Sequence, residues 1–385
     1  MRIIVTGQSG IDKSAFLDSF KKLCYTKKLP STTTDGFAFD YDVVLNKNIL
    51  NHAKIDHIFD LEHEMCKKNK WLTPNYLDKP ISDLLHAKNS ILQDLIKKSR
   101  NDNNTILAMH LNYLRKSSLY QILDWKELRE FKPEMIIILI DDIYSIKNRI
   151  DNRNSDDDYV RAMSLKDIAW WREAEIAASK NLADNLLDEN IPFYIVAVAH
   201  GPQILYQLMF ESKHARENKW KKMVYASYPI SLAKTDTNLQ TEVNRFIKLL
   251  KKNFIVFVPG TIKEKILHDK FVENFKRPVP HGIIKVDNEQ YQINDIAHVI
   301  VDINGQIITR DERLIDQSQA IFAYRPAQSI GSQFEIQYAI RSGSITTYVY
   351  HPSKDGSSPF ATGAKVIDDF KTFLDEIEKY AKSTT

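Results

Sequence analysis

Cysteine is scarce in this sequence, with only two residues, Cys24 and Cys66, among 385. A secreted fold built on disulfides is therefore excluded, and no charged, apolar and cleavage-site pattern opens the chain. The cytoplasm is the expected compartment. Long apolar runs are also lacking: none approaches the ~18 residues of a membrane-spanning helix. The longest run, 135–140, is typical of a buried strand, so no membrane association is expected.

An excess of charge of one sign is absent as well. Lys and Arg total 53 against 50 Asp and Glu, which leaves a net charge of +3 and no general attraction to nucleic acid polymers or anionic membranes. The 11 histidines show no metal-ligand spacing with Cys or carboxylates, so no zinc site is expected. Hydrophobic residues make up 43% of the chain, as in globular proteins, and its length suggests two domains.

Short apolar, β-branched runs alternate with segments of helical periodicity along most of the chain. This alternation predicts an α/β protein with parallel sheets that carry helices on their faces. A charged and polar stretch at 211–222 interrupts the pattern, so we expect two doubly wound domains, 1–210 and 222–385. Strands are predicted at the start of the chain and at 105–109, 135–140, 192–198, 223–226, 254–258, 299–303, 320–324 and 346–350.

Residues 7–14 (GQSGIDKS) stand between a predicted strand and a predicted helix. They match the phosphate-loop pattern of Gly, four residues, Gly, Lys and Ser/Thr, except that Asp12 replaces the second Gly. Asp tolerates positive φ, but its charge beside phosphates predicts weakened or altered nucleotide binding. The alternative is a tight turn with a solvated lysine. The residues expected to bind nucleotide are Gly7, Ser9, Gly10, Lys13 and Ser14, the last through Mg²⁺.

The first domain resembles the P-loop nucleoside and nucleotide kinases over about residues 1–210. The resemblance implies ATP and Mg²⁺ as cofactors, an acidic residue after a central strand that helps hold the metal, and a mobile lid whose arginines clamp the phosphoryl group. By position, Asp141 is the metal candidate, and Arg149 and Arg153 are the lid candidates. Asp141 and Asp142 are equally placed to cap the helix that follows them.

The segment 309–339 reads as helix, buried strand, loop and helix. Asp311 lies on the helix before the strand, and Glu335 lies in the helix after it. Ser329 and Gly331 come directly before that second helix, where a hydroxyl group and exposed backbone amides can meet a phosphate at the positive end of the helix dipole. The segment therefore predicts two carboxyl groups and an anion site in one cleft.

This segment is similar to the 2'-deoxynucleoside 5'-phosphate N-hydrolases and, more distantly, to the nucleoside 2-deoxyribosyltransferases, over about residues 222–352. The resemblance rests on Asp311, Ser329, Gly331, Glu335 and Ala339 at the family's spacing. It implies a smaller, Rossmann-like sheet that needs no cofactor. Glu335 would attack or stabilise the anomeric carbon, Asp311 would assist the departing base, and Ser329 would hold a 5'-phosphate. Cleavage of an N-glycosidic bond calls for a carboxylate at the anomeric carbon and a proton donor at the base, and two carboxyl groups in different environments can divide these roles.

The family's first strand commonly ends with Tyr, two residues, Gly and Pro, whereas residues 225–229 read YASYP. Tyr225 and Pro229 are expected to line the substrate pocket. Tyr228 in place of Gly predicts a narrower pocket or a different base. An alternative explanation of the acidic residues is that Ser332 with Glu335, and Thr309 with Glu312, form capping boxes that only start helices.

The sequence thus predicts a two-domain enzyme of nucleotide metabolism. Its C-terminal domain would hydrolyse, or transfer the sugar of, a (deoxy)nucleoside 5'-monophosphate, and its N-terminal domain would bind ATP. The alternative is a nucleotide-sensing regulatory or defence protein in which the altered phosphate loop gates the second domain. Nucleotides are the expected partners, in a homo-oligomer. The preferred base and sugar are left open.

Overall fold

The computed structural model describes residues 1–26, 54–71, 76, 79–115, 118–121, 125–152, 163–187, 190–215, 220–279, 281–286, 289–327, 329–352 and 362–383. Within these residues, no helix combines the length and the apolar character needed to cross a membrane. Two parallel five-stranded sheets are present, together with two antiparallel hairpins. The predicted α/β class is therefore confirmed.

The chain divides into two compact units. Residues 199–210 group with unit 2 and residues 262–307 with unit 1, and the predicted domain limits of 1–210 and 222–385 stay a prediction. Unit 1 consists of Met1–Lys21, Lys54–Val198 and Ile262–Ile307, and unit 2 of Lys22–Ala53, Ala199–Thr261 and Ile308–Thr385.

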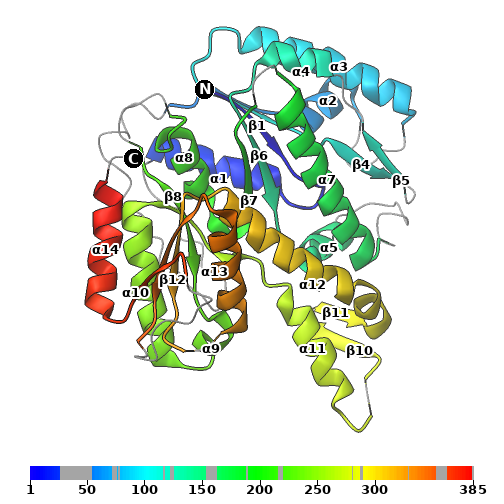
Figure 1. Ribbon diagram of the computed structural model, residues 1–385. Helices are drawn as coiled ribbons and strands as arrows, with labels where there is room; N and C mark the ends of the chain where they lie inside the picture. The colour runs from blue at the N-terminus through cyan, green and yellow to red at the C-terminus, as the bar shows by residue number, and fades with distance from the viewer. Residues whose placement is uncertain are drawn as a thin grey trace. The chain divides into compact units, whose positions relative to one another are not determined.

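The sheet of unit 1 has the strand order β2-β3-β1-β6-β7. Figure 1 labels β1, β6 and β7 of this sheet. Its strands are β1 (Arg2–Thr6), β2 (His57–Asp60), β3 (Thr105–Ala108), β6 (Met135–Ile140) and β7 (Phe193–Ala197). The central strands are almost entirely buried because both faces of a parallel sheet are covered. With β3 and β6 on either side of β1, the loop after β1 opens at the point where ligands bind in such sheets.

Helices surround this sheet. They are α1 (Lys13–Thr26), α2 (Leu61–Asn69), α3 (Ile81–Lys98), α4 (Trp125–Phe131), α5 (Ile143–Asp151) and α7 (Leu165–Asn185), and the hairpin β4 (Asn112–Arg115) and β5 (Ser118–Gln121) follows β3. Ile4, Leu107 and Ile136 of the sheet form one core with apolar side chains of α2, α3 and α4. These helices therefore enclose the core of the sheet, and the loops that carry the candidate site follow the carboxyl ends of the strands.

Unit 1 also contains a segment from the C-terminal half of the chain. It consists of α11 (Lys265–Phe275), the hairpin β10 (Ile283–Val286) and β11 (Glu289–Gln292), and most of α12 (Ile293–Asp316). Leu267, Ile296 and Ile303 pack in one core with Ile146 of α5 and Trp171 of α7. Residues far apart in sequence thus complete this unit.

The strand predicted at 299–303 is wrong, because these residues lie inside α12. Ile296, Val299 and Ile303 are fully buried at helical spacing, whereas Val301 is 78% exposed. A run of β-branched residues favours a strand, but its packing against a neighbouring layer decides the outcome. Here one helical face contacts α5 and α7, and the helix forms.

The sheet of unit 2 has the strand order β14-β13-β12-β8-β9. Its strands are β8 (Met223–Ser227), β9 (Ile255–Phe257), β12 (Ala320–Tyr324), β13 (Thr346–Tyr350) and β14 (Lys365–Ile367). The order reverses between β8 and β12, which makes the carboxyl ends of these two strands the expected ligand site. The helices are α8 (Pro202–Phe210), α9 (Ile230–Ala233), α10 (Thr237–Asn253), α13 (Ile330–Ser342) and α14 (Phe370–Lys382), with short 3₁₀ turns at Val198–His200 and Pro259–Thr261.

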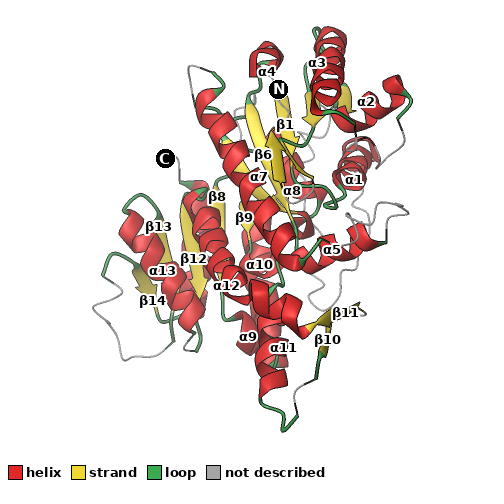
Figure 2. Cartoon of the chain, turned by 90° about the vertical axis from the view of Figure 1, so that its right-hand side faces the viewer, coloured by secondary structure: helices red, strands yellow, loops and turns green. Residues whose placement is uncertain are grey.

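The two faces of this sheet carry different helices. Val224 and Ala226 of β8 belong to the core made with α10 and α14, while Ala323 of β12 packs against Ile336 of α13. Figure 2 shows α13 lying along the strands of this sheet. Successive side chains of a strand point to opposite faces, so Tyr225 and Ser227 point toward the α13 face.

Candidate functional site

The phosphate loop joins β1 to α1, as the sequence predicts. Gly7 and Gly10 have φ angles of 142° and 86°. A Cβ atom would lie 2.9 Å from the Leu139 carbonyl oxygen at Gly7, and 2.9 Å from a side-chain carbon of Ile146 at Gly10. Asp12 has a φ of 62°. The residue that departs from the pattern therefore keeps the left-handed backbone that the pattern's glycine would adopt.

Lys13, the first residue of α1, turns back into the loop. Its Nζ donates a hydrogen bond to the carbonyl oxygen of Gly7 at 2.6 Å and lies 2.9 Å from Nδ1 of His110. His110 follows β3, the neighbour of β1, and its Nδ1 lies 2.6 Å from the same carbonyl oxygen. His110 is not among the predicted site residues. Its place directly after a strand was the available signal.

Ser14 donates a hydrogen bond from Oγ to Oδ2 of Asp60 at 2.7 Å. Asp60 ends β2 and caps α2, where its Oδ1 accepts from the backbone N–H of His63. A hydroxyl and a carboxylate beside a phosphate loop suit Mg²⁺, which takes few protein ligands and completes its shell with phosphates and water. Asp60 was missed because the short strand β2 was not predicted. The described part of the chain holds no cluster of three or more His, Cys, Asp or Glu fit for a metal ion.

Asp141, the predicted metal ligand, is bound to Arg149. Arg149 donates from Nη2 to Oδ2 of Asp141 and from Nε to the carbonyl oxygen of Gly10, the latter at 2.6 Å. Asp141 and Arg149 thus lie together at the loop. The carboxylate that contacts Ser14, the other predicted metal ligand, belongs to Asp60 and not to Asp141. Ser9 lies half-buried within the loop.

The remaining predictions for this edge of the sheet concern Asp142 and Arg153. Asp142 stands at the N-cap of α5 without a capping bond from its side chain. Its Oδ1 instead accepts from the backbone N–H of Lys263 at 2.5 Å. Arg153 lies outside the described residues.

In unit 2, two hydroxyl groups of β8 reach Glu335 on α13. Tyr225 donates to Oε1 at 2.9 Å, and Ser227 donates to Oε2. Both donors are completely buried. Hydrogen bonds from hydroxyl groups favour the ionised carboxylate and fix the direction of its oxygens. The sequence predicts Tyr225 here and misses Ser227, although a spacing of two residues on a strand puts both on the same face.

Asp311 is the second carboxyl group of this site. Burial, and then the charge of Asp311, raise the pKa of Glu335 to about 8. Burial also raises the pKa of Asp311, against the opposing charge of Arg310, whose Nε and Nη2 donate to Oδ1 at 2.9 and 2.7 Å. Two such carboxyl groups resist ionising together, so the pair holds a proton near neutral pH.

Ser329 caps α13, where its Oγ accepts a hydrogen bond from the backbone N–H of Ser332. The capping box proposed for Ser332 is therefore wrong, because the helix already begins at Ile330. The capping box at Thr309 is wrong too, since Thr309 lies inside α12. Neither Glu335 nor Glu312 starts a helix, and a different reason is needed for the carboxylate of Glu335.

The predicted phosphate site lies at the start of α13. Gly331 is exposed in the first turn, and a Cβ atom there would meet no atom within 4 Å. The first N–H groups of a helix have no partner within the helix and attract anions. Ser329 and Gly331 are thus adjacent to a helix end of the required polarity, one to two turns before Glu335.

Tyr228 and Pro229 follow β8 and are both buried. Tyr228 belongs to the core that contains Val224, and its hydroxyl oxygen lies 2.8 Å from the position of a Cβ atom built on Gly260. The hydroxyl end of Tyr228 thus lies close to Gly260. Pro229 occupies the N-cap position of α9.

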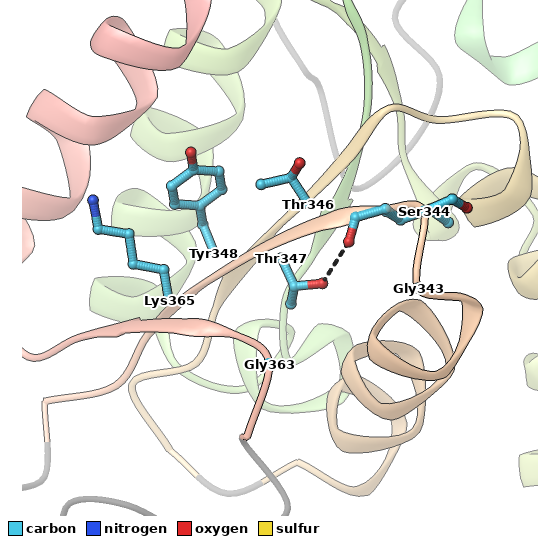
Figure 3. Close-up of a pocket in the computed structure, with 8 residues that line it drawn as sticks. Gly343, Ser344, Thr346, Thr347, Tyr348, Gly363 and Lys365 are labelled. Atoms are coloured by element: carbon cyan, nitrogen blue, oxygen red, sulfur yellow. Dashed lines mark hydrogen bonds between the residues drawn. The ribbon is translucent and has the colours of Figure 1, made fainter.

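A pocket of about 360 Å³ lies at a different place in unit 2 (Figure 3). It is lined by residues 343–348 with Gly363 and Lys365. These residues belong to the end of α13 and the start of β13 and β14, which is the amino edge of the sheet. Thr347 donates a hydrogen bond from Oγ1 to the carbonyl oxygen of Ile345 at 3.2 Å. A dashed line marks this bond at Thr347 in Figure 3. The pocket is therefore separate from the carboxyl edge, where Ser227 meets Glu335.

No family model matches the sequence, and no curated protein matches it either. Solved structures do match, among them the shikimate kinase from Bacteroides thetaiotaomicron. That match has 11% sequence identity and a TM-score of 0.29, and it covers 65% of this chain and 98% of the kinase. Such a TM-score is too low to establish a shared fold.

Proposed function

We propose that unit 2 cleaves the N-glycosidic bond of a (deoxy)nucleoside 5'-monophosphate, with Glu335 and Asp311 as its carboxyl pair. The observation that carries this proposal is the double hydrogen bond from Tyr225 and Ser227 to the two oxygens of Glu335. A carboxylate that only started a helix would not need two buried donors from a strand. A carboxylate aimed at a reacting carbon does need them.

The two carboxyl groups divide the work. Cleavage develops positive charge on the sugar and negative charge on the base. In the reactive form the single proton of the pair lies on Asp311. Glu335, then ionised, forms a bond to, or stabilises, the anomeric carbon while the carbon–nitrogen bond breaks, and Asp311 gives that proton to the departing base. Water, or a second base, then takes the sugar from Glu335. A pair that holds one proton near neutral pH is suited to these two roles.

The 5'-phosphate would lie at the start of α13. Ser329 offers a hydroxyl group there, and the first backbone N–H groups of the helix offer donors for an anion. A carboxylate in place of Ser329 would repel a phosphate. The serine therefore favours a phosphorylated substrate over a free nucleoside.

Unit 1 would bind ATP at the phosphate loop, with Lys13 on the outer phosphates and Mg²⁺ held by Ser14 and Asp60. The bound metal would neutralise phosphate charge. Since such a unit can phosphorylate a nucleoside, it could supply the 5'-monophosphate that unit 2 consumes. Both units would then act on one pool of nucleotides.

Base release tests the glycosidase proposal. The full chain and its Glu335→Gln variant are incubated with ribo- and deoxyribonucleoside 5'-monophosphates, with and without ATP and Mg²⁺, and free base is measured by chromatography. We expect release by the wild type and by Glu378→Gln, a control on the exposed face of α14, and none by Glu335→Gln. Absence of release from every substrate would contradict the proposal.

A second candidate is a nucleotide-sensing protein in which the phosphate loop binds without turnover and gates unit 2. It is favoured by Asp12, whose exposed carboxylate brings negative charge to a loop that holds phosphates. Lys13→Ala separates the two. If the variant loses phosphoryl transfer, unit 1 acts as a kinase. If phosphoryl transfer stays at its background level in both proteins and base release changes in the variant, the loop gates unit 2.

A further inference from the structure

The phosphate loop contains a histidine that its pattern does not require. Nδ1 and Nε2 of His110 lie 2.9 and 3.2 Å from Nζ of Lys13. The same Nδ1 lies 2.6 Å from the carbonyl oxygen of Gly7, which also accepts a hydrogen bond from Nζ. The lysine, the histidine and the first residue of the loop therefore meet at one point.

Buried charged groups fix the backbone of His110 on both sides. Its N–H donates to Oε1 of Glu62 at 3.0 Å, and its carbonyl oxygen accepts from Nζ of Lys88 at 2.6 Å. Glu175, fully buried on α7, accepts from the backbone N–H groups of Leu111 and Asn112, which follow His110, both at 2.8 Å. Such a network is costly to bury and rigid once satisfied, so it holds the imidazole in place.

The surroundings keep this imidazole neutral in the absence of a nucleotide. Burial, and then the positive charges of Lys13 and Lys88, lower the pKa of His110 well below its ordinary value, against a smaller opposing effect of Asp60. A neutral imidazole carries one N–H donor and one acceptor. Because the carbonyl oxygen of Gly7 can only accept, the N–H of the neutral ring is on Nδ1, and Nε2 presents its lone pair to Nζ of Lys13 at 3.2 Å.

We propose that His110 belongs to the nucleotide site and contacts the terminal phosphate of a nucleoside triphosphate. The proposal rests on nucleotide binding by the phosphate loop, as inferred above for unit 1. In such loops the backbone N–H groups hold the inner phosphates and the lysine reaches the outer ones. A group from the neighbouring strand that touches the lysine is therefore within two hydrogen-bond lengths of the outer phosphate.

This contact would let the protein distinguish a triphosphate from a diphosphate. A diphosphate ends at the phosphate that the loop and Lys13 already hold, and it leaves His110 without a partner from the ligand. A triphosphate extends one group further, and its negative charge favours the uptake of a proton from water by Nε2, whose N–H then donates to the terminal phosphate. A hydrogen bond to a charged group changes affinity by about tenfold or more.

The experiment compares the affinities of the full chain for ATP and ADP, each with Mg²⁺, by calorimetry. The variants are His110→Gln, His110→Asn and, as a matched control, His86→Gln on the exposed side of α3. We expect His110→Asn, whose amide nitrogen can take the place of Nδ1 but which has no group at the place of Nε2, to lose about tenfold in ATP affinity with ADP affinity unchanged. His110→Gln, whose amide nitrogen can take the place of Nε2, should retain part of the preference, and His86→Gln all of it.

The ratio of the two affinities is the decisive readout. A purely structural histidine would deform the loop and weaken ATP and ADP alike, and an equal loss in both would overturn the proposal. A variant with both affinities unchanged would overturn it too. If the wild type bound neither nucleotide, nucleotide binding by unit 1 would fail together with the role of His110, whereas base release by unit 2 would be unaffected.

Discussion

The hydroxyl group of Ser227, the last residue of β8, donates a hydrogen bond to Oε2 of Glu335 on α13. Its neighbour on the same face, Tyr225, donates to the other oxygen. Ser227 and Glu335 are 108 positions apart in the chain, and the reversal of strand order between β8 and β12 brings them together. This arrangement fixes the direction of the carboxylate and partly offsets the burial and the Asp311 charge that raise the pKa of Glu335.

Removal of the Ser227 hydroxyl should weaken base release. Ser227→Ala deletes a donor that stabilises the ionised form of Glu335, so the pKa of Glu335 should rise further above its wild-type value. We expect kcat/KM at pH 7 to fall by about tenfold. The pH profile should shift to higher pH. Ser344→Ala, at an exposed serine of the same unit, serves as control and should leave the profile unchanged.

Removal of the Asp311 charge should lower the pKa of Glu335, whereas Ser227→Ala should raise it. The carboxylate of Asp311 raises the pKa of Glu335, so Asp311→Asn should bring that pKa below about 8. Titration of the Glu335 carboxyl carbon by NMR, assigned by its loss in Glu335→Gln, measures the shift. Base release should fall in the same variant because the proton donor is gone. An unchanged titration would show that the two carboxyl groups do not interact.

The raised pKa of Glu335 predicts how stability depends on pH. In the unfolded chain the group titrates near 4.5, and in the folded chain near 8. Folding thus favours the protonated form, and its contribution is complete below pH 4.5 and is lost as pH rises through 8. Glu335→Gln lacks this loss. Its melting temperature relative to wild type should therefore increase between pH 5 and pH 9, and a constant difference would contradict the raised pKa.

Asp12 separates the effect of charge from that of backbone conformation. Its φ of 62° suits glycine, so Asp12→Gly should stabilise unit 1 by about 1 kcal/mol and also strengthen ATP binding. Asp12→Asn removes only the negative charge and should strengthen ATP binding with little change in stability. Thermal unfolding and calorimetry measure the two effects. Weaker ATP binding in both variants would mean that the carboxylate serves the ligand.

The buried ion pair of Arg172 and Glu264 should hold residues 262–307 in unit 1. Nη2 of Arg172 donates to Oε2 of Glu264 at 3.0 Å and to the side-chain oxygen of Gln306 at 2.5 Å. Glu264 also accepts from the N–H of Ile143 at the start of α5. Removal of one partner leaves a buried charge, so Arg172→Leu should destabilise unit 1 by about 3 to 5 kcal/mol.

Urea unfolding measures this loss, and hydrogen exchange should show faster opening in 262–307. The double variant Arg172→Leu with Glu264→Leu is the control, since it leaves no unpaired charge and should recover part of the stability. If the single and double variants were equally unstable, the ion pair would not be the cause.

The features that depend on residues close together in the sequence were predictable. The loop of residues 7–14, the buried strand at 135–140 and the strand at 320–324 each follow from local periodicity or from a spacing of a few residues. The position of Glu335 on a helix after that last strand follows in the same way. A β-branched run misled at 299–303, because burial on α5 and α7 outweighs local preference there.

The sequence by itself therefore determined the α/β class, the loop of residues 7–14 between a strand and a helix, and the helix that carries Glu335, since each is encoded within a short stretch of chain. Only the tertiary structure decided the partners: Asp60 for Ser14, His110 for Lys13, and Ser227 for Glu335. Each pair joins residues from separate elements, and strand order brings them to one edge of a sheet. The physical reason is that hydrogen bonds form between atoms that are close in space, and spacing along the chain does not encode that closeness.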